Sequence, residues 1–382
     1  MPQRVTLRDI ARKAKLHAST VSRALRNHPN VPPSTRLRVQ KISKKLGYIP
    51  DPKLASLAIH LRNLHGVSYQ ATLAWVFNGS NPNWWRGGSI YNDFYDGARM
   101  RAEELGYKLE IFWLNEAGMS MKRASSVLRA RNISGLVIAP LSRTFARLNL
   151  DWSFFSTVAI GYSLISPQLH RVAPNHFSAA KTLVHQLWSY GYRRIGFASK
   201  TNLDQRMQHG WSGGYMTYLA EKLRRYPDAP IVPFFTRDLS PQRIEPSFWK
   251  WYEKYRPEVI ITPSATFVPE LLKKRGLQVP RDVGLAYLNL QAETGPQAGI
   301  YEKPVKVGAA AIELLTGMLQ HHEKGIPESP KKVLIEGAWK DGNTLRKMVA
   351  PKIGGVASKE PQSKQRGING SRRTSVGSRR CP

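Results

Sequence analysis

Apolar residues recur at helical spacing in three short stretches near the start of the chain. Thr6 followed by Asp9 predicts a capping box for the first helix, whose apolar stripe is Leu7, Ile10, Ala11 and Ala14. A second helix is expected over residues 18–26, with an apolar face of Val21, Ala24 and Leu25. A third begins at Pro33 and ends at Gly47, with the stripe Val39, Ile42 and Leu46. This pattern predicts a small three-helix domain over residues 1–50.

A fourth apolar stripe lies in the stretch DPKLASLAIHLR, which Pro52 is suited to open as a helix. Its apolar positions at helical spacing are Leu54, Leu57, Ala58 and Leu61. An isolated helix of this length is marginal in water. We therefore expect residues 51–68 to be a hinge helix and linker that needs another surface to order it.

From Gln70 the pattern changes to buried runs of strand length that alternate with helical segments. The strand-like runs are ATLAWVF, KLEIFWL, GLVIAPL, TVAIGY, RRIGFAS, IVPFF, EVIIT, DVGLAYLNL and KVLIEGAW. The helical segments are YNDFYDGARMRAEELGY, SMKRASSVLRARN, residues 205–225 and VGAAAIELLTGMLQHHEKG. Such alternation predicts an α/β core, residues 69–345, of two subdomains with parallel sheets covered by helices. A cleft between two sheets is a usual place for a small ligand.

The charge of the chain changes this picture, because 382 residues carry a formal net charge of +32. Up to Arg62 there are 14 Lys and Arg against two acidic residues, and residues 351–382 hold eight against one. Such an excess points to a polyanionic partner. The final segment, residues 346–382, is rich in Gly, Ser and Pro and is predicted to be a disordered basic tail. A generally basic proteome and a merely solvated tail remain alternatives.

Other classes of protein have weak support in the sequence. Cys381 is the single cysteine, so a disulfide framework and a cysteine-built metal site are excluded. No apolar run is long enough to span a membrane, and MPQRVTLRDI lacks a secretory signal, so we expect a cytoplasmic protein with no membrane partner. We expect no metal, no cofactor and no enzyme activity, because no phosphate-binding loop or nucleophile elbow is visible. A Ser/His/Asp triad assembled by the fold stays open.

Two short helices joined by a tight turn, the second with a polar outer face, are typical of a helix-turn-helix. The residues predicted to face outward on the second helix are Ala18, Ser19, Ser22 and Arg23. Arg23 is suited to bind guanine through its guanidinium fork, and Ser19 to bind bases or phosphates. Phosphate contacts are expected from Arg26, Arg36, Lys41, Lys44 and Lys45. A basic three-helix bundle with a solvated face is the alternative.

Several motifs resemble those of the lactose-repressor (LacI/GalR) family of bacterial transcription regulators. The head carries TLRDIA, TVSRAL and LGYIP at the family's spacing, and YDGARMRAEELGY, ISGLVIAPL and GYRRIGFAS extend the resemblance through the core. The resemblance implies a periplasmic-binding-protein-like core and a homodimer, sometimes a tetramer, on a pseudo-palindromic operator. It implies hinge helices that fold on DNA, with Leu57 as a wedge between base steps. The implied DNA-binding residues are Thr6, Ala18, Ser19, Thr20, Ser22, Arg23, Asn30, Tyr48, Leu54 and Leu57.

The sequence also departs from the family pattern. Lys15 stands where glycine is common in the turn, and His17 where a serine cap is common, so the turn is expected to be strained or capped by His17. Leu54 replaces a small hinge residue. The resemblance implies a small-molecule effector in the cleft, with Trp84, Trp85, Arg206, Trp211 and Asn289 as candidate contacts. Pro263 and Ser264 replace an expected Asn–Asp pair, which leaves a carbohydrate as one candidate effector among others.

These observations favour a sequence-specific transcriptional regulator, a repressor rather than an activator, whose operator affinity depends on a small-molecule effector. A sequence-neutral architectural DNA protein would share the charge but has no need of a large core that forms a cleft. A transport-type binding protein would share the core but has no use for a basic head and needs a secretion signal.

Overall fold

The computed structural model describes residues 5–25, 31–48, 71–83, 90–223, 231–237, 240–264 and 266–348. The predicted hinge segment and the basic tail from residue 349 lie outside these ranges. In the described part, no helix is long and apolar enough to cross a membrane.

The head contains the three predicted helices, α1 (Leu7–Ala14), α2 (Ala18–Leu25) and α3 (Pro33–Leu46). The predicted stripes meet in one apolar cluster, in which Ile10, Val21, Ala24 and Val39 are fully buried. The Asp9 carboxylate accepts a hydrogen bond from the Thr6 backbone N–H at 2.9 Å, which satisfies a donor at the start of α1. Gly47 ends α3 with φ +68°, as its position at the end of the stripe predicts.

The turn between α1 and α2 requires a left-handed residue, and that residue is Lys15. Its φ of 53° and ψ of 46° place it in the left-handed helical region, where its backbone N–H bonds to the carbonyls at the end of α1. A side chain with a Cβ atom is disfavoured there, whereas glycine is not. The strain expected from the replacement of a glycine is therefore present in the backbone.

The first sheet of the core has the strand order β13-β7-β5-β3-β1-β2, and all of its strands are parallel. The strand bounds are β1 (Ala71–Phe77), β2 (Tyr107–Trp113), β3 (Gly135–Ile138), β5 (Ser156–Ile160), β7 (His170–Pro174) and β13 (Lys332–Ile335). A small separate sheet pairs β4 (Ala146–Arg147) with β6 (Leu164–Ser166), and Trp152–Phe154 form a 3₁₀ turn.

Helices cover both faces of this sheet because successive residues of a strand point to opposite sides. Leu73, Trp75 and Phe77 of β1 pack with α5 (Ile90–Glu104) and α12 (Pro304–His321). Ala74 and Val76 face the other side, with α6 (Met121–Ala130). A strand buried on both faces is continuously apolar, which is why ATLAWVF shows no alternation.

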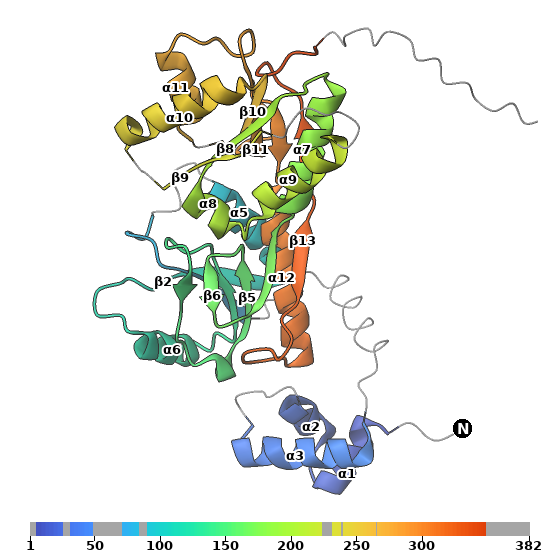
Figure 1. The fold of residues 1–382 in the computed structure, drawn as a ribbon. Helices are drawn as coiled ribbons and strands as arrows, with labels where there is room; N and C mark the ends of the chain where they lie inside the picture. Colours follow the sequence, from blue (N-terminus) through green and yellow to red (C-terminus); the bar gives the residue numbers. More distant parts are fainter. Residues whose placement is uncertain are drawn as a thin grey trace, which may run out of the picture. The chain divides into compact units, whose positions relative to one another are not determined.

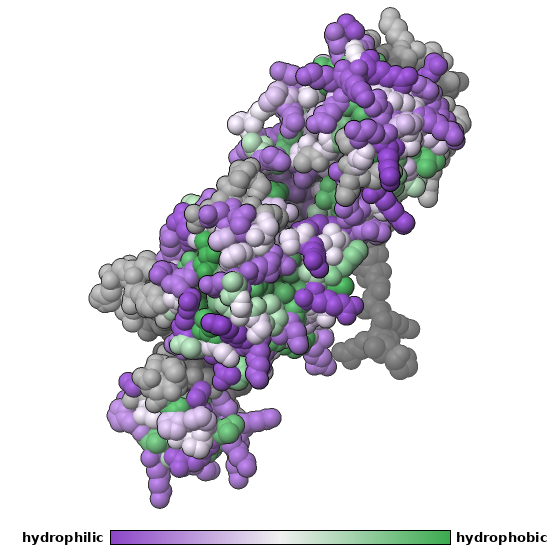
Figure 2. All heavy atoms as spheres, turned by 90° about the vertical axis from the view of Figure 1, so that its left-hand side faces the viewer, coloured by the Kyte–Doolittle hydropathy of each residue, from purple (hydrophilic) through white to green (hydrophobic). Residues whose placement is uncertain are grey.

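The second sheet has the order β14-β12-β11-β10-β8-β9, and β14 alone pairs antiparallel among its described strands. Its strands are β8 (Ile195–Lys200), β9 (Phe234–Thr236), β10 (Val259–Thr262), β11 (Gly284–Leu290), β12 (Gly299–Tyr301) and β14 (Ala338–Lys340). Helices α7 (His176–Ser189) and α9 (Gly210–Leu223) cover one face, and α10 (Pro241–Tyr255) and α11 (Val268–Lys274) cover the other (Figure 1). The face drawn in Figure 2 is mainly hydrophilic, with smaller hydrophobic patches.

Two predicted elements prove to be divided. KVLIEGAW is not one strand: it forms β13 in the first sheet and β14 in the second, with the chain crossing between the sheets at residues 336–337. The helix expected over residues 205–225 is broken into α8 (Thr201–Arg206) and α9, because Gln208 and His209 adopt φ values of 53° and 56°. A local apolar pattern does not reveal either break, since both halves of each element are apolar on one side.

We expect Lys15→Gly to stabilise the head by about 1 kcal/mol, because it removes the left-handed strain of a residue with a Cβ atom. Hydrogen exchange of the buried amides of α1 and α2 in the full chain would measure the change. Lys13→Gly is the matched control, since Lys13 lies within α1. There glycine should destabilise the head by about 1 kcal/mol. Equal loss of protection in both variants would contradict the prediction.

Candidate nucleic-acid interface and ligand cavity

The outer surface of the head is strongly basic. Its described residues include ten Lys and Arg and one acidic residue, Asp9. Arg23 is exposed on α2, and Lys41, Lys44 and Lys45 are exposed on α3. The chemistry of this surface suits a phosphate backbone, with a guanidinium on the helix expected to read bases.

The other residues predicted to bind DNA have different surroundings. Thr6 is tied to Asp9 through its hydroxyl at 2.6 Å, and Thr20 is half-buried. Ala18 and Tyr48 pack against the apolar cluster of the head, which corrects the expectation that Ala18 points fully outward. α2 includes Ser19 and Ser22, whose side chains are not described. The remaining predicted positions, Asn30, Leu54 and Leu57, lie outside the described residues, as does Arg26.

Arg38, for which the sequence analysis predicts no role, connects two helices of the head. Its guanidinium donates a hydrogen bond to the backbone carbonyl of Ala14 at 3.3 Å. Carbonyls at the end of a helix lack partners within the helix. Arg38 therefore contributes to holding α3 against the end of α1, whereas Lys41, Lys44 and Lys45 are exposed on α3.

A cavity of about 350 Å³ lies at the carboxyl ends of strands from both sheets. From the first sheet, its wall includes residues that follow β3, β5 and β7, with the start of α5. From the second sheet, it includes residues at or after the ends of β8, β11 and β12. This is the edge at which open α/β sheets bind ligands, because the loops and helix starts converge there.

Three of the five predicted effector residues line this cavity: Arg206, Trp211 and Asn289. Arg206 donates a hydrogen bond across the cavity wall to the backbone carbonyl of Leu141, at 2.7 Å. Asn289 accepts one from the Ser264 backbone N–H at 3.0 Å, which keeps its amide oxygen in place. Trp84 and Trp85 lie outside the described residues.

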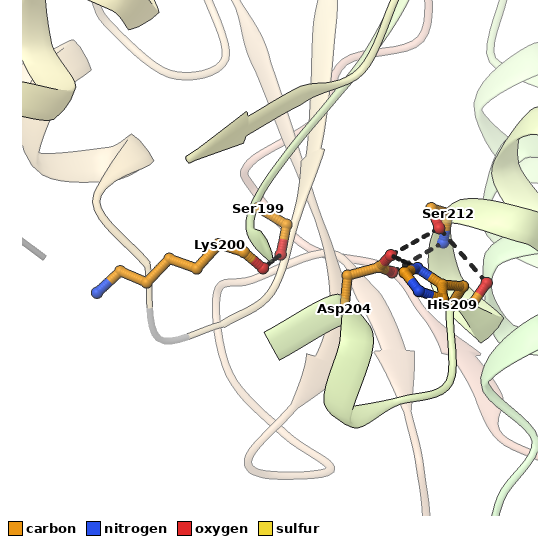
Figure 3. Close-up of polar contacts among 5 residues, drawn as sticks. All are labelled: Ser199, Lys200, Asp204, His209 and Ser212. Carbon is orange, nitrogen blue, oxygen red and sulfur yellow. Dashed lines mark hydrogen bonds and ion pairs between the residues drawn. The ribbon is translucent and has the colours of Figure 1, made fainter. Parts of the chain in front are cut away.

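The break between α8 and α9 positions Arg206. Asp204, which is 1% exposed, accepts hydrogen bonds from the Ser212 backbone N–H at 3.2 Å and from the Ser212 hydroxyl at 2.7 Å. It also bonds to His209 Nδ1 at 2.8 Å. Figure 3 shows this cluster at the α8–α9 corner, with Lys200 extending away from it. The carboxylate thus caps the start of α9 and fixes the turn that follows Arg206.

The same cluster contains a serine, a histidine and an aspartate, but it does not have the arrangement of a catalytic triad. In a triad, the serine hydroxyl bonds to the histidine, which takes its proton. Here the Ser212 hydroxyl donates to Asp204, and the Asp204 carboxylate also occupies His209 Nδ1. The arrangement is that of a helix cap. In the described ranges, no group of three His, Cys, Asp or Glu residues is suited to hold a metal ion.

Two side-chain pairs join the crossovers between the sheets, and one of them lines the cavity. His176, at the start of α7, bonds through Nδ1 to Glu302, which follows β12, at 2.7 Å. Both side chains are buried, with exposures of 6% and 3%. Asn175 donates to Glu336, which follows β13, at 2.6 Å. None of the three crossover residues His176, Glu302 and Glu336 was predicted, because sequence spacing does not indicate that they meet.

Aromatic rings form much of the remaining wall. Trp211 and His176 make an edge-on contact with ring centroids 5.1 Å apart, and Tyr162 lies 6.0 Å from His176. Burial raises the pKa of Tyr162, although the charge of Arg171 opposes the shift. Tyr162 therefore remains a neutral phenol at physiological pH. Burial also lowers the pKa of Arg171, with Tyr162 opposing that shift.

Comparison with known protein families supports both halves of this arrangement. Residues 6–51 match the model of bacterial regulatory proteins of the lacI family, and residues 184–343 match the periplasmic binding protein-like domain. The two ranges together cover more than half of the chain. The chain belongs to the LacI family.

Individual members of the family resemble this LacI-family protein along most of its length. Catabolite control protein A of Priestia megaterium is 26% identical over 327 residues, covering 82% of this chain and 92% of that protein. A transcriptional regulator CelR–cellobiose complex aligns with a TM-score of 0.54 at 18% identity, covering 89% of this chain and all of CelR. The lac repressor dimer bound to operator and the anti-inducer ONPF aligns with a TM-score of 0.50 at 16% sequence identity. The alignment covers 90% of this chain and 100% of the lac repressor chain. The two structures establish the fold, and the relatives are regulators and not enzymes.

We expect Glu302→Ala to destabilise the core of this LacI-family protein by about 2–3 kcal/mol, because it leaves the buried His176 imidazole without its partner. Urea denaturation followed by tryptophan fluorescence would measure the loss. Glu336→Ala is the matched control: it breaks an exposed crossover bond and should cost less than about 1 kcal/mol. Similar costs for the two variants would show that burial of the His176–Glu302 pair is unimportant.

Proposed function

We propose that the chain is a sequence-specific transcriptional repressor whose affinity for its operator is controlled by a small molecule bound in the core cavity. One observation carries the proposal: a basic helix-turn-helix head and a two-sheet core with a cavity at its strand ends occur in the same chain. A head alone would suffice for DNA binding, and a core alone for ligand binding. Their combination supports control of one by the other.

In the proposed complex, α2 lies in the major groove and Arg23 binds the O6 and N7 atoms of guanine. The exposed lysines of α3 contact phosphates, which positions the head without reading sequence. Two heads of a homodimer would meet the two halves of a pseudo-palindromic operator, as in the lac repressor dimer bound to operator. We retain Ser19, Ser22, Asn30, Leu54 and Leu57 as proposed DNA contacts.

The cavity is the proposed effector site, with Arg206, Trp211 and Asn289 among its contacts. A ligand held by both subdomains would favour one relative position of the two sheets, and the three crossovers would carry that preference through the core. Control of this kind is allosteric because two sites and two global states are involved. Regulation of transcription places the protein in the bacterial cytoplasm.

An architectural DNA protein without an effector is the competing candidate, since the basic charge alone would serve it. The two differ in what they protect on a chromosome. A regulator should protect a defined site of two half-sites, whereas an architectural protein should protect DNA with little sequence preference. Genome-wide footprinting with the purified full chain would separate them.

We expect Arg23→Ala to weaken operator binding by about 1–3 kcal/mol and to relax selectivity at one base pair of each half-site, because a base-reading guanidinium is lost. Lys44→Ala is the matched control and should weaken binding to all duplexes alike. Gel-shift titrations with the operator and with a single-substituted set would measure both effects. Unchanged selectivity in Arg23→Ala would refute its base-reading role.

We also expect operator affinity to fall steeply with salt, because lysines and arginines that bind phosphates release condensed counterions. With five phosphate contacts per head and two heads, the slope of log K against log [salt] should approach about −9. Fluorescence anisotropy at several concentrations of NaCl would measure it. A slope shallower than about −3 would be inconsistent with docking of two basic heads.

A further inference from the structure

Several hydrogen-bond donors in and around the cavity have no acceptor or counter-charge within the described part of the protein. Lys200 and Arg206 both line it, and neither makes an ion pair with an acidic residue among the described residues. The hydrogen bond to Leu141 uses one of the five N–H groups of the Arg206 guanidinium. Trp211 is 1% exposed, and its indole Nε1–H has no hydrogen-bond partner in the described structure. A buried donor of this kind is costly unless a partner arrives.

Three acceptors of the cavity already have hydrogen-bond partners within the protein. Glu302 is the one carboxylate among the described lining residues, and it is bonded to His176 at 2.7 Å. The Asn289 amide oxygen accepts the Ser264 N–H, and the Ser163 hydroxyl accepts the Leu141 N–H at 2.8 Å. A neutral polyol would find acceptors such as the Thr144 hydroxyl and the Asn202 amide in the lining, but it would bring no counter-charge to Lys200 and Arg206.

A third cation lies behind the wall. Arg171 is 2% exposed and makes no ion pair with an acidic residue in the described part of the chain. Its guanidinium donates to the carbonyls of Gly161, a lining residue, at 2.7 Å and of Leu164 at 3.1 Å, and it lies 5.4 Å from the ring centroid of Tyr162. A buried charge without a counter-charge raises the electrostatic potential around it, because the low dielectric constant screens it poorly.

We infer that the effector carries an anionic group, a carboxylate or a phosphate, which binds to Lys200 and Arg206. This inference deepens the proposed function and rests on it for the regulatory role of the ligand. An anion at this position offers acceptors to the free N–H groups of Lys200 and Arg206 and neutralises their charge. The aromatic wall of Tyr162 and Trp211 is left for the neutral, ring-like part of the same molecule.

The test compares ligands that differ only in charge. Aldohexoses and aldopentoses are offered to the full chain together with their uronic acids and terminal phosphates, and binding is measured by calorimetry and by the shift of the unfolding temperature. At least one acid or phosphate should bind ten or more times more tightly than its neutral parent. Comparison of the uronic acids with the terminal phosphates then shows whether the anionic group is a carboxylate or a phosphate. If a neutral sugar binds as tightly as its charged forms, or if no charged member binds, the inference is wrong.

Substitution of the cation provides a second readout. In Lys200→Gln, the ratio of charged to neutral affinity should fall at least tenfold, an effect that general loosening of the fold would not produce. Lys122→Gln, exposed on α6 and outside the cavity lining, is the matched control and should keep the ratio of the unaltered protein. An unchanged ratio of charged to neutral affinity in Lys200→Gln would show that the anion does not contact this lysine and would overturn the proposal.

Operator binding measured in the same samples distinguishes failure of the anionic-effector inference from failure of the proposed function. If a neutral sugar alters operator affinity and charged ligands do not, the proposed function holds and the anionic effector is wrong. If the full chain binds no duplex with sequence preference, the proposed function is wrong, and the affinity ratio alone decides the chemistry of the cavity.

Discussion

The core depends on the fact that its two sheets are joined by three crossovers that are hydrogen-bonded to one another. The chain passes between the sheets after β7, after β12 and after β13. His176–Glu302 ties the first crossover to the second, and Asn175–Glu336 ties the first to the third. Movement of one sheet against the other must therefore bend all three crossovers together. Because His176 and Glu302 also line the cavity, a ligand there contacts the parts of the backbone that any closure must bend.

The head and the core use positive charge in different ways. Exposed lysines of the head are surrounded by water, so each contributes little to folding and remains free to bind phosphates. Lys200 and Arg206 line a concave site, and Arg171 is buried behind it. There each charge costs solvation free energy, and it persists because carbonyls, an aromatic ring or a ligand supply compensation. The net charge of the chain therefore combines charges with two separate roles, which composition alone does not distinguish.

Much of the fold could be predicted from periodicity, because helix stripes and strand runs are local patterns. Periodicity predicts the three head helices and the alternation of strands and helices in the core, but α7, α10 and α11 were not among the predicted helical segments. The division of KVLIEGAW between two sheets was missed, since whether a strand continues depends on which neighbours are available and not on its own residues. The α8–α9 break was missed because Gln208 and His209 carry no turn signal, and Asp204 holds the turn through contacts.

Some residues that line the cavity can be predicted from the sequence, whereas the contacts between them cannot. Arg206, Trp211 and Asn289, whose positions the resemblance supplies, line the cavity because the carboxyl ends of parallel strands bring such positions together. Glu302 was missed because it is 126 residues from His176 and only the fold makes them partners. This pair decides the chemistry of the site. Glu302 is the one carboxylate among the described lining residues, and it bonds to His176 and makes no ion pair with Lys200 or Arg206. The two cations therefore line the cavity without a direct acidic partner, which only the three-dimensional structure reveals.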